Sequence, residues 1–445
     1  MAGTAAAYTL KNAGYKVTIL ERSDRLGGRM HSEVVDGVSL EMGSGFISRV
    51  YTNVLDFLRT NKLDDKLFQQ SGRSGMMRSG SIHMIGPKEL AGTKVLSWRA
   101  KWPLIGLLAE TIRRKARLDL HKLWLADIYD KRSVASKYTT PGRKEFMEYV
   151  LQPVLNAYFY WMPEHTSEAV MSILVNAALQ KGGTFKFRGG LTRIPEFAAK
   201  DCAVQLNCEV KSVTRQNNGQ FEITALQNKR EITFAADGLV CATTATVVPK
   251  IITHLSKQQR EFFAAIDYSA TVVMAQSYKT KDTHEAKAVA FPRLEDNDLA
   301  AITLSPEQDI ASKEFKVSGL KMYASGAIGK HLAQKSDEQI IHFFERKLAP
   351  ARDQFLREGA TPLSTRIQRW PEVIPHFDVG HLARLRAFHD GAIENNTVPL
   401  VFAGDYIGAP YIEGAFTSGV AAANRLVDRL AIQRSGPDNR ATLKN

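Results

Sequence analysis

The pattern of small, apolar and polar residues at the start of the chain predicts a helix followed by a strand. Residues 5–13 have the small side chains of a closely packed helix, and "YKVTIL" is rich in the β-branched residues of a strand. Gly3 precedes the helix and Glu21 ends the strand. This order is typical of the second half of a dinucleotide-binding unit, so we expect a strand and two further glycines upstream in the natural protein.

The pattern changes three times along the rest of the chain. Residues 90–180 have helical periodicity, which we expect to break at Pro103, Pro141, Pro153 and Pro163. Short strand-like runs with turns such as "NNG" follow, and a mixed block covers residues 255–390. A strand, a loop and an alanine-rich helix close the chain in "VPLVFAGDYIGAPYIEGAFTSGVAAANRL". The alternation predicts an α/β fold with a helical insertion.

Three distant segments each carry part of one kind of anion site. Gly3 and Glu21 combine a helix N-terminus, which favours phosphate, with a carboxylate that accepts hydrogen bonds from ribose hydroxyls. In "ERSDRLGGR" a glycine pair lets a ligand approach the backbone, and Arg29 offers a forked cation. Asp405 follows a strand-like run, and Gly414 precedes a helix start. Each feature alone is typical of a turn or a cap, so the prediction depends on their combination.

Length and composition limit the class of protein. With 445 residues and 44% hydrophobic content the chain can form more than one domain. Its three cysteines, Cys202, Cys208 and Cys241, have the spacing of neither a disulfide framework nor a zinc site, so we expect no metal and a cytoplasmic setting. No leader peptide and no apolar run of about 18 residues is present, so we expect no membrane span.

The net charge of +13 is concentrated in residues 94–122, where eight Lys or Arg residues face two carboxylates. Apolar side chains interrupt these charges: Trp98, Trp102, Leu104, Ile105, Leu107 and Leu108. Two interpretations remain open, a solvated basic helix face or a peripheral contact with the inner face of a membrane. Nucleic acid is not expected as a partner, because no binding motif accompanies the charge.

Five motifs together resemble the flavin-containing amine oxidase superfamily, which includes amine oxidases, protoporphyrinogen oxidases and carotenoid-type desaturases. They are "ERxxxxGGR" from Glu21 to Arg29, "EMGSGF", "GGLTRIP", "RWPEVIPHFDVGH" and "FAGDYIGAPYIEGAFTSG". The resemblance covers nearly the whole chain. It implies noncovalently bound FAD and a Rossmann-like FAD-binding domain, formed by residues 1–48, 182–250 and 395–432. Residues 49–181 and 251–394 would form an α+β substrate domain that carries the helical insertion.

The resemblance also assigns residues to the cofactor. The candidates for binding FAD are Gly3, Glu21, Arg22, Gly28, Arg29, Gly43, Val210, Gly404, Asp405, Gly414 and Ala415. Gly3 and Glu21 would hold the pyrophosphate and the adenosine ribose, and Val210 would contact the adenine edge. Gly414 and Ala415 would direct backbone N–H groups at the pyrimidine end of the flavin, where negative charge develops on reduction.

Catalysis then requires few side chains, because flavin N5 accepts the hydride and the protein holds the substrate and excludes water. The resemblance places Trp370 and Tyr411 in the wall of the flavin pocket. His376 is the candidate for acid–base work, and His381 is a second one, although a single histidine is more often structural.

The chain departs from the amine oxidases at two positions. Val273 occupies the place of a lysine that many of them bridge to flavin N5 through water, and the second tyrosine of their aromatic pair is missing near Gly380. We therefore expect a large apolar small-molecule substrate rather than a small primary amine, with oxygen or a quinone as the electron acceptor. The function expected is an FAD-dependent oxidoreductase; the alternatives are a protoporphyrinogen oxidase or polyene desaturase, and a noncatalytic scaffold.

Overall fold

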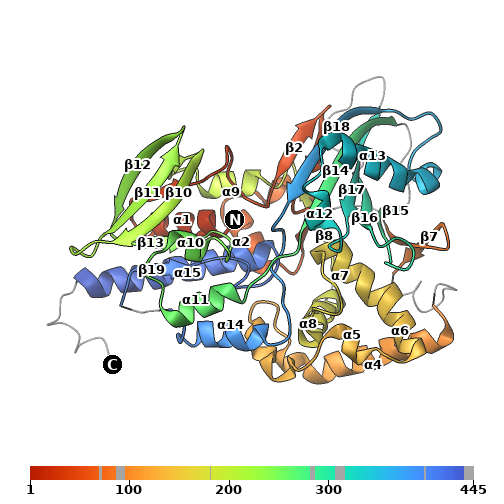
Figure 1. Cartoon of the computed structure of the whole chain (residues 1–445), viewed down its shortest axis with the longest axis horizontal. Coiled ribbons are helices and arrows are strands. Elements are labelled where there is room, and N and C mark those ends of the chain that lie inside the picture. The colour runs from red at the N-terminus through yellow and green to blue at the C-terminus, as the bar shows by residue number, and fades with distance from the viewer. Residues whose placement is uncertain are drawn as a thin grey trace.

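The computed structural model describes residues 1–69, 73–86, 96–180, 182–280, 286–305, 316–394 and 397–434. Figure 1 shows three regions: a small sheet with long helices on the left, a large sheet at the upper right and a group of helices below it. Because Lys94 is outside the described residues, only part of the basic segment can be placed in the fold.

The first region contains the two ends of the described chain. Helix α1 (Ala2–Asn12) packs along α15 (Ile412–Arg434) through small side chains, and a Cβ on Gly419 would lie 2.2 Å from the carbonyl oxygen of Ala2. Two parallel pairs accompany the helices, β1 (Thr18–Leu20) with β9 (Ala203–Gln205), and β13 (Leu239–Cys241) with β19 (Leu400–Phe402). Parallel pairs beside packed helices are typical of α/β nucleotide-binding architecture.

An antiparallel sheet extends from this region. It contains β10 (Cys208–Arg215), β11 (Phe221–Gln227) and β12 (Arg230–Ala236), in the order of the sequence. The short helices α9 (Arg193–Ala198), α10 (Val248–Ile251), α11 (Lys257–Ala264) and α14 (His381–His389) lie in the same half of the molecule (Figure 1). The strand-like runs expected from about residue 203 onwards thus form strands, as predicted.

The second region is a mixed sheet whose strands follow the order β18-β14-β17-β16-β15-β6-β7. Their bounds are Pro362–Trp370, Thr271–Thr280, Lys316–Ala324, Leu299–Ser305, Ala286–Ala290, Arg73–Arg78 and Ser81–Ile85. One face packs on α13 (Asp337–Leu348) and α12 (Gly329–Leu332). The other face carries Val273, Ala275 and Tyr323 and packs on β2 (Ser32–Val35) and β3 (Val38–Glu41). Because side chains alternate along each strand, the sheet separates one hydrophobic core beneath α12 and α13 from a second core beneath β2 and β3.

A small three-stranded sheet lies between these regions. It pairs β8 (Thr184–Phe187) with β4 (Ile47–Ser48) on one side and β5 (Leu67–Gln69) on the other. Helix α2 (Thr52–Thr60) packs beside this sheet. Its first backbone N–H groups are capped by Glu413, a residue distant in the sequence, which accepts from Asn53 N at 2.8 Å and Val54 N at 2.9 Å. This cap fixes the start of α15 against α2.

The third region is the helical insertion, as expected. Its helices are α4 (Trp98–Arg114), α5 (Val134–Lys137), α6 (Pro141–Phe146), α7 (Gln152–Phe159) and α8 (Glu168–Leu179), with 3-10 turns at Lys115–Arg117 and Leu123–Tyr129 and a π-turn at Met147–Leu151. Two other 3-10 turns, Asp64–Lys66 and Ala349–Gln354, follow α2 and α13.

One predicted helix break is wrong. Pro103 lies inside α4, which continues to Arg114. Proline removes the N–H that would bond the carbonyl four residues earlier, that of Arg99, and this carbonyl lies against Gly142 of α6, where a Cβ would be only 3.0 Å away. Packing against a residue without a side chain thus accommodates the proline. Pro141 and Pro153 do lie at helix starts.

Candidate active site

The N-terminus of α1 lies in a ring of charged side chains that come from three distant segments. Burial and the nearby Arg29 lower the pKa of the Met1 amino group to about 6, and Glu21 and Asp405 oppose that shift. Glu21 follows β1, Arg29 follows the glycine pair, and Asp405 follows β19. The structure therefore brings together the three segments that the sequence singled out.

The two most closely coupled members of this ring are Arg29 and Asp405. Arg29 donates from Nη1 to Asp405 Oδ2 at 2.7 Å and from Nη2 to Oδ1 at 2.9 Å, and its Nη1 also donates to the carbonyl oxygen of Val373 at 2.8 Å. Burial opposes the charge of Arg29, but Asp405 outweighs this effect and raises the arginine pKa. The pair fixes the third segment against the first.

Glu21 has one carboxylate oxygen engaged and one open. Its Oε1 accepts from the backbone N and the Oγ of Ser23, both at 2.9 Å. Within the described part of the chain, Oε2 has no donor. An oriented, half-buried carboxylate with a free oxygen is suited to hydroxyl groups of a ligand.

Close backbone contacts explain two of the glycines. A Cβ on Gly43 would lie 2.0 Å from the carbonyl oxygen of Arg29, and one on Gly414 would lie 2.2 Å from the carbonyl oxygen of Ala409. Gly414 and Ala415 are in the first turn of α15, and Gly404 donates its N–H to Ser418 Oγ at 3.0 Å. The loop after β19 is thus folded tightly onto the helix start that the sequence assigned to the flavin.

Other cofactor candidates lie at the edge of this arrangement. Gly3 is in the first turn of α1, where a Cβ would meet Ala242 at 3.3 Å, and Gly28 adopts a φ of +57° with open space around it. Arg22 is exposed and lowers the pKa of Glu209 after the larger effect of Lys211. Val210 lies at a bulge in β10. Gly28 directly precedes Arg29 in the chain, and among the described residues no hydrogen bond or ion pair joins the side chains of Arg22 and Val210 to the Arg29–Asp405 pair.

The two aromatic candidates lie in different walls. Trp370, at the end of β18, donates Nε1 to the carbonyl oxygen of Met42 at 2.8 Å. Tyr411 donates its hydroxyl to the carbonyl oxygen of Leu120 at 3.0 Å and stacks on Tyr51, with ring centroids 5.6 Å apart. Trp370 is thus held by the segment that leads to Gly43, and Tyr411 by the helical insertion.

The histidine candidates are separate from both aromatic residues. Burial lowers the pKa of His376, whose charged neighbours include Asp378 and Asp267. His381 is fully buried against Phe377, and burial lowers its pKa to about 3, so it is neutral at ordinary pH. The acid–base role of His376 remains a prediction.

Two tyrosines that the sequence did not predict as site residues, Tyr158 and Tyr160, lie at the end of α7 beside the aromatic candidates. Tyr158 keeps 50% of its surface accessible, and yet burial raises the pKa of its hydroxyl. Its ring packs edge-on against Phe46, with 5.9 Å between the ring centroids. Tyr160 is likewise partly accessible with a strongly raised pKa, and it follows α7 with a φ of +57°. The sequence "NAYFYW" at the end of α7 was the available signal.

A group of buried charges lies beside the aromatic cluster that contains Tyr160 and Trp370. Lys321 of β17 is 2% exposed and donates Nζ to the carbonyl oxygen of Glu41 at 3.2 Å, while Lys186 of β8 is partly accessible. Burial lowers the pKa of each lysine to about 8. Neither lysine was predicted as a site residue, because each lies in a strand without a recognisable motif.

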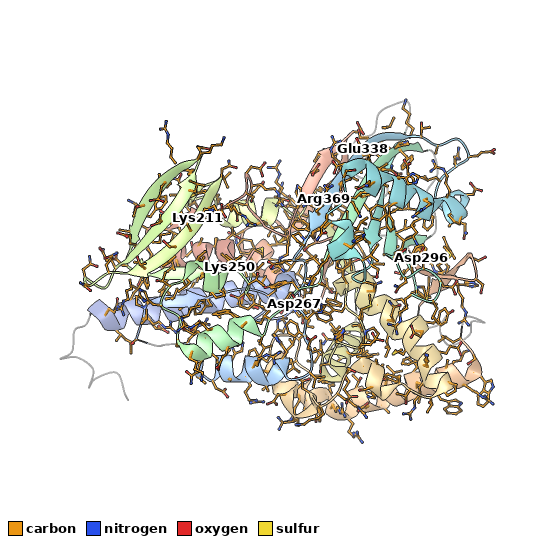
Figure 2. The ribbon with its side chains drawn as sticks, in the orientation of Figure 1. Lys211, Lys250, Asp267, Asp296, Glu338 and Arg369 are labelled. Carbon is orange, nitrogen blue, oxygen red and sulfur yellow. The ribbon has the colours of Figure 1, made fainter. Side chains whose placement is uncertain are left out.

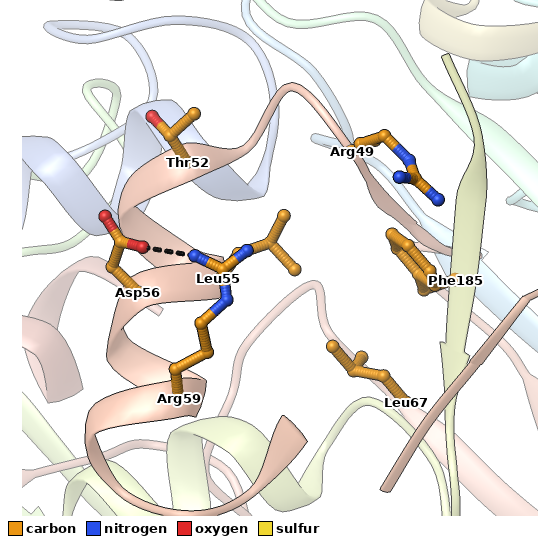
Figure 3. A pocket seen from close by; sticks show the side chains of 7 residues that line it. All are labelled: Arg49, Thr52, Leu55, Asp56, Arg59, Leu67 and Phe185. Atoms are coloured by element: carbon orange, nitrogen blue, oxygen red, sulfur yellow. Dashed lines mark hydrogen bonds and ion pairs between the residues drawn. The ribbon is translucent and has the colours of Figure 1, made fainter. Parts of the chain in front are cut away.

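A surface pocket of about 230 Å³ opens on the opposite face of β8. Figure 3 shows Arg49 and Phe185 facing Thr52, Leu55, Asp56 and Arg59 of α2, with Leu67 below. It contains none of the predicted site residues. Because side chains alternate along a strand, Phe185 faces this pocket while Lys186 faces the interior. Among the described residues, no group of histidine, cysteine and carboxylate side chains has the arrangement of a metal site.

Comparison with known proteins identifies the family to which the chain belongs. The family model described as flavin containing amine oxidoreductase matches residues 1–427. The chain belongs to the flavin-containing amine oxidoreductase family. It is therefore a flavin-dependent oxidoreductase, and this membership supports an enzyme over the noncatalytic scaffold.

Curated members of the flavin-containing amine oxidoreductase family cover almost the full chain. Polyamine oxidase 4 of Oryza sativa subsp. japonica is 22% identical, and the alignment covers 98% of this chain and 89% of that protein. Protoporphyrinogen oxidase 2, chloroplastic/mitochondrial, of Arabidopsis thaliana is 21% identical over 97% of this chain and 92% of its own length. At this identity the relatives include both amine and porphyrinogen oxidases.

The fold is that of the solved amine oxidases. Cyclohexylamine oxidase from Brevibacterium oxydans superposes with a TM-score of 0.75 at 16% identity, over 97% of each chain. The expected fold class, a Rossmann-like α/β domain with a second α+β domain and a helical insertion, is confirmed. The domain boundaries given from the sequence remain a prediction.

Proposed function

We propose that the chain is an FAD-dependent oxidoreductase that removes a hydride from an organic substrate. The single observation that carries the proposal is the convergence of Glu21, Arg29 and Asp405 on the N-terminus of α1, within a chain of the flavin family. A helix N-terminus favours a pyrophosphate, and the open Oε2 of Glu21 favours ribose hydroxyls. These features fit the dinucleotide arm of FAD rather than a smaller flavin.

The residues of this chain would hold FAD in three places. Glu21 and the first turn of α1 would bind the adenosine ribose and the pyrophosphate, and Asp405 with Gly404 would bind the ribityl region. The backbone N–H groups at the start of α15, at Gly414 and Ala415, would face the pyrimidine end. Bound flavin supplies the hydride acceptor and passes two electrons to the second substrate.

The remaining side chains position the substrate and exclude water. Trp370, near Tyr160, and Tyr411, near Tyr158, would form the two walls of an aromatic substrate cavity. Aromatic walls of this kind hold a large, mostly apolar body and keep a C–H bond close to the acceptor. Because Val273 is apolar, no lysine ammonium is available from that position of β14.

The substrate proposed is therefore a large apolar molecule, as for a protoporphyrinogen oxidase or a polyene desaturase, with oxygen or a quinone as the acceptor. The aromatic cavity and the apolar residue at position 273 favour it over a small primary amine. The relatives include by name both an amine oxidase and a porphyrinogen oxidase, so they are compatible with either substrate class.

A peripheral membrane contact through α4 would suit such a substrate. Exposed apolar side chains recur along one side of the helix at Trp98, Trp102, Ile105 and Ile112, between basic residues at both ends. The expected membrane contact is wrong for Leu104 and Leu107. Both lie on the other side of α4 and pack into the core of the helical insertion. Among the described residues, no helix has the length and apolar character required to cross a bilayer.

Anaerobic reduction tests the function. The purified holoprotein is mixed without oxygen with amines, porphyrinogens and polyenes, and the flavin absorbance is followed. We expect bleaching with a large apolar compound and restoration of colour by oxygen or a quinone. Rapid bleaching by small primary amines alone would contradict the proposed substrate class.

A further inference from the structure

Lys186 and Lys321 place two ammonium groups around a single carboxylate, that of Glu41. Glu41 is 1% exposed, and its two oxygens are already engaged, Oε2 by Ser32 Oγ at 2.5 Å and Oε1 by Leu191 N at 3.2 Å. Lys321 reaches only the backbone oxygen of Glu41, and Lys186 has no carboxylate within ion-pair distance in the described part of the chain. The group thus has more buried positive than negative charge.

Such an arrangement costs free energy unless an anion completes it. A buried ammonium is stabilised by a nearby negative charge and destabilised by a like charge. The two like charges disfavour each other's ammonium form, whereas Glu41 favours the charged form of both lysines. A carboxylate brought by a ligand would supply the missing negative charge.

The lysines lie next to the proposed flavin wall. The carbonyl oxygens of two consecutive residues, Glu41 and Met42, accept from Lys321 Nζ and from Trp370 Nε1. Tyr323, two residues from Lys321 on the same face of β17, lies under the ammonium, with 5.8 Å between Nζ and the ring centroid. Tyr160 and Trp370 pack in the same apolar cluster as Tyr323. Lys321 therefore lies beside the aromatic residues proposed to hold the substrate, and Lys186 is close enough to Lys321 and Glu41 to interact with both electrostatically.

We propose that Lys186 and Lys321 form a binding site for a carboxylate group of the substrate. The substrate would then have a large apolar body, which the aromatic walls hold, and an acidic end, which the lysines hold. This inference rests on the proposed function, because it names the substrate class of the same cavity.

Binding of the carboxylate should depend on pH through the lysines. The other charged and titratable groups that face them are Glu41 of β3 and Tyr323 of β17. Because the carboxylate requires the ammonium form, affinity should be highest below a pH of about 8, where both lysines are protonated, and should fall above it.

The probe that tests the site is octanoate, with octanol as its uncharged partner and acetate as an anion without an apolar body. Binding to the holoprotein is measured by the change in the flavin spectrum and, independently of the flavin, by titration calorimetry. We expect Lys186→Met and Lys321→Met each to weaken octanoate binding at least tenfold and to leave octanol binding unchanged. Lys211→Met is the control, because Lys211 lies on β10, away from the large sheet (Figure 2).

Four results would overturn the inference: no octanoate binding to the unchanged chain, equal octanoate binding by all variants, equal loss of octanol binding, or acetate binding as tight as that of octanoate. A colourless protein that takes up no FAD and still binds octanoate through both lysines would contradict the proposed function alone. A protein that contains FAD but does not bind octanoate would contradict the lysine site alone.

Discussion

Arg29 and Asp405, which are 376 residues apart in the sequence, form a two-bond ion pair beside the N-terminus of α1. Asp405 is nearly buried, with 6% of its side chain accessible, and Arg29 is 27% accessible. The pair joins the loop after the glycine motif to the loop before α15. It thereby fixes the two loops that would contact opposite ends of FAD, so the pair acts on stability and on cofactor binding together.

Asp405→Asn removes the negative partner and leaves the arginine charge in a confined site. Loss of one member of a buried pair costs about 3 to 5 kcal/mol, whereas an exposed pair contributes about 1 kcal/mol or less. We expect a clear loss in the free energy of unfolding, measured with urea, and weaker FAD retention. The control is Asp267→Asn (Asp267 is labelled in Figure 2), which breaks the exposed contact with Lys330 at 3.4 Å. Equal effects of the two substitutions would contradict the role of the pair.

Glu21→Ala should release FAD. Hydrogen bonds to a charged group contribute roughly 1.5 to 3 kcal/mol, so affinity should fall at least tenfold. The measurement is the dissociation constant of FAD from the apoprotein, followed by flavin fluorescence. Glu209→Ala is the matched control, because Glu209 pairs with Lys211 on the surface of β10. An unchanged affinity in Glu21→Ala would remove this carboxylate from the site.

Lys321→Met should stabilise the chain when no ligand is bound. The pKa of Lys321 is lowered from 10.5 to about 8 by burial, so the folded state bears the cost of a buried charge fully below pH 8 and loses it as the pH rises towards 10.5. The gain in the free energy of unfolding should be at most about 3 kcal/mol at pH 7 and much smaller at pH 10. Denaturant unfolding at both pH values measures it. A loss of stability at pH 7 would show that the ammonium is well compensated without a ligand.

The exposed side of α4 should bind anionic vesicles in a salt-sensitive manner. Basic residues near an anionic surface contribute about 1 kcal/mol each, and salt screens this attraction. Sedimentation with anionic and neutral vesicles, at low and high salt, measures the bound fraction. A double change, Trp98→Ser with Trp102→Ser, should abolish binding, whereas Leu294→Ser, at a site that is also exposed but lies outside α4, should not. Protein that stays in the supernatant with anionic vesicles at low salt would exclude the contact.

The sequence predicted the parts of the site that depend on backbone conformation. Gly43 and Gly414 lie where a side chain would collide with a neighbouring carbonyl, and such requirements leave glycines at fixed spacings. Strand pairing, in contrast, is not visible in a single sequence. Lys186 of β8 and Lys321 of β17 come from strands of different sheets and meet only near Glu41, so no local pattern revealed them.

The helical insertion shows a second limit of local patterns. Periodicity correctly predicted helices there, but it could not tell which apolar residues of α4 would be covered. Leu107 is buried in the helical core, and Ile112, which the sequence analysis left out, is 66% exposed. Neighbouring helices, which are distant in sequence, decide this distribution.

The most direct test of the account is the identity and amount of flavin on the purified chain. The protein is denatured, and the released cofactor is measured by its absorbance and its mass. We expect flavin bands in the folded protein and one FAD per chain, or uptake to that ratio when FAD is added. A colourless protein that takes up no added FAD would contradict it.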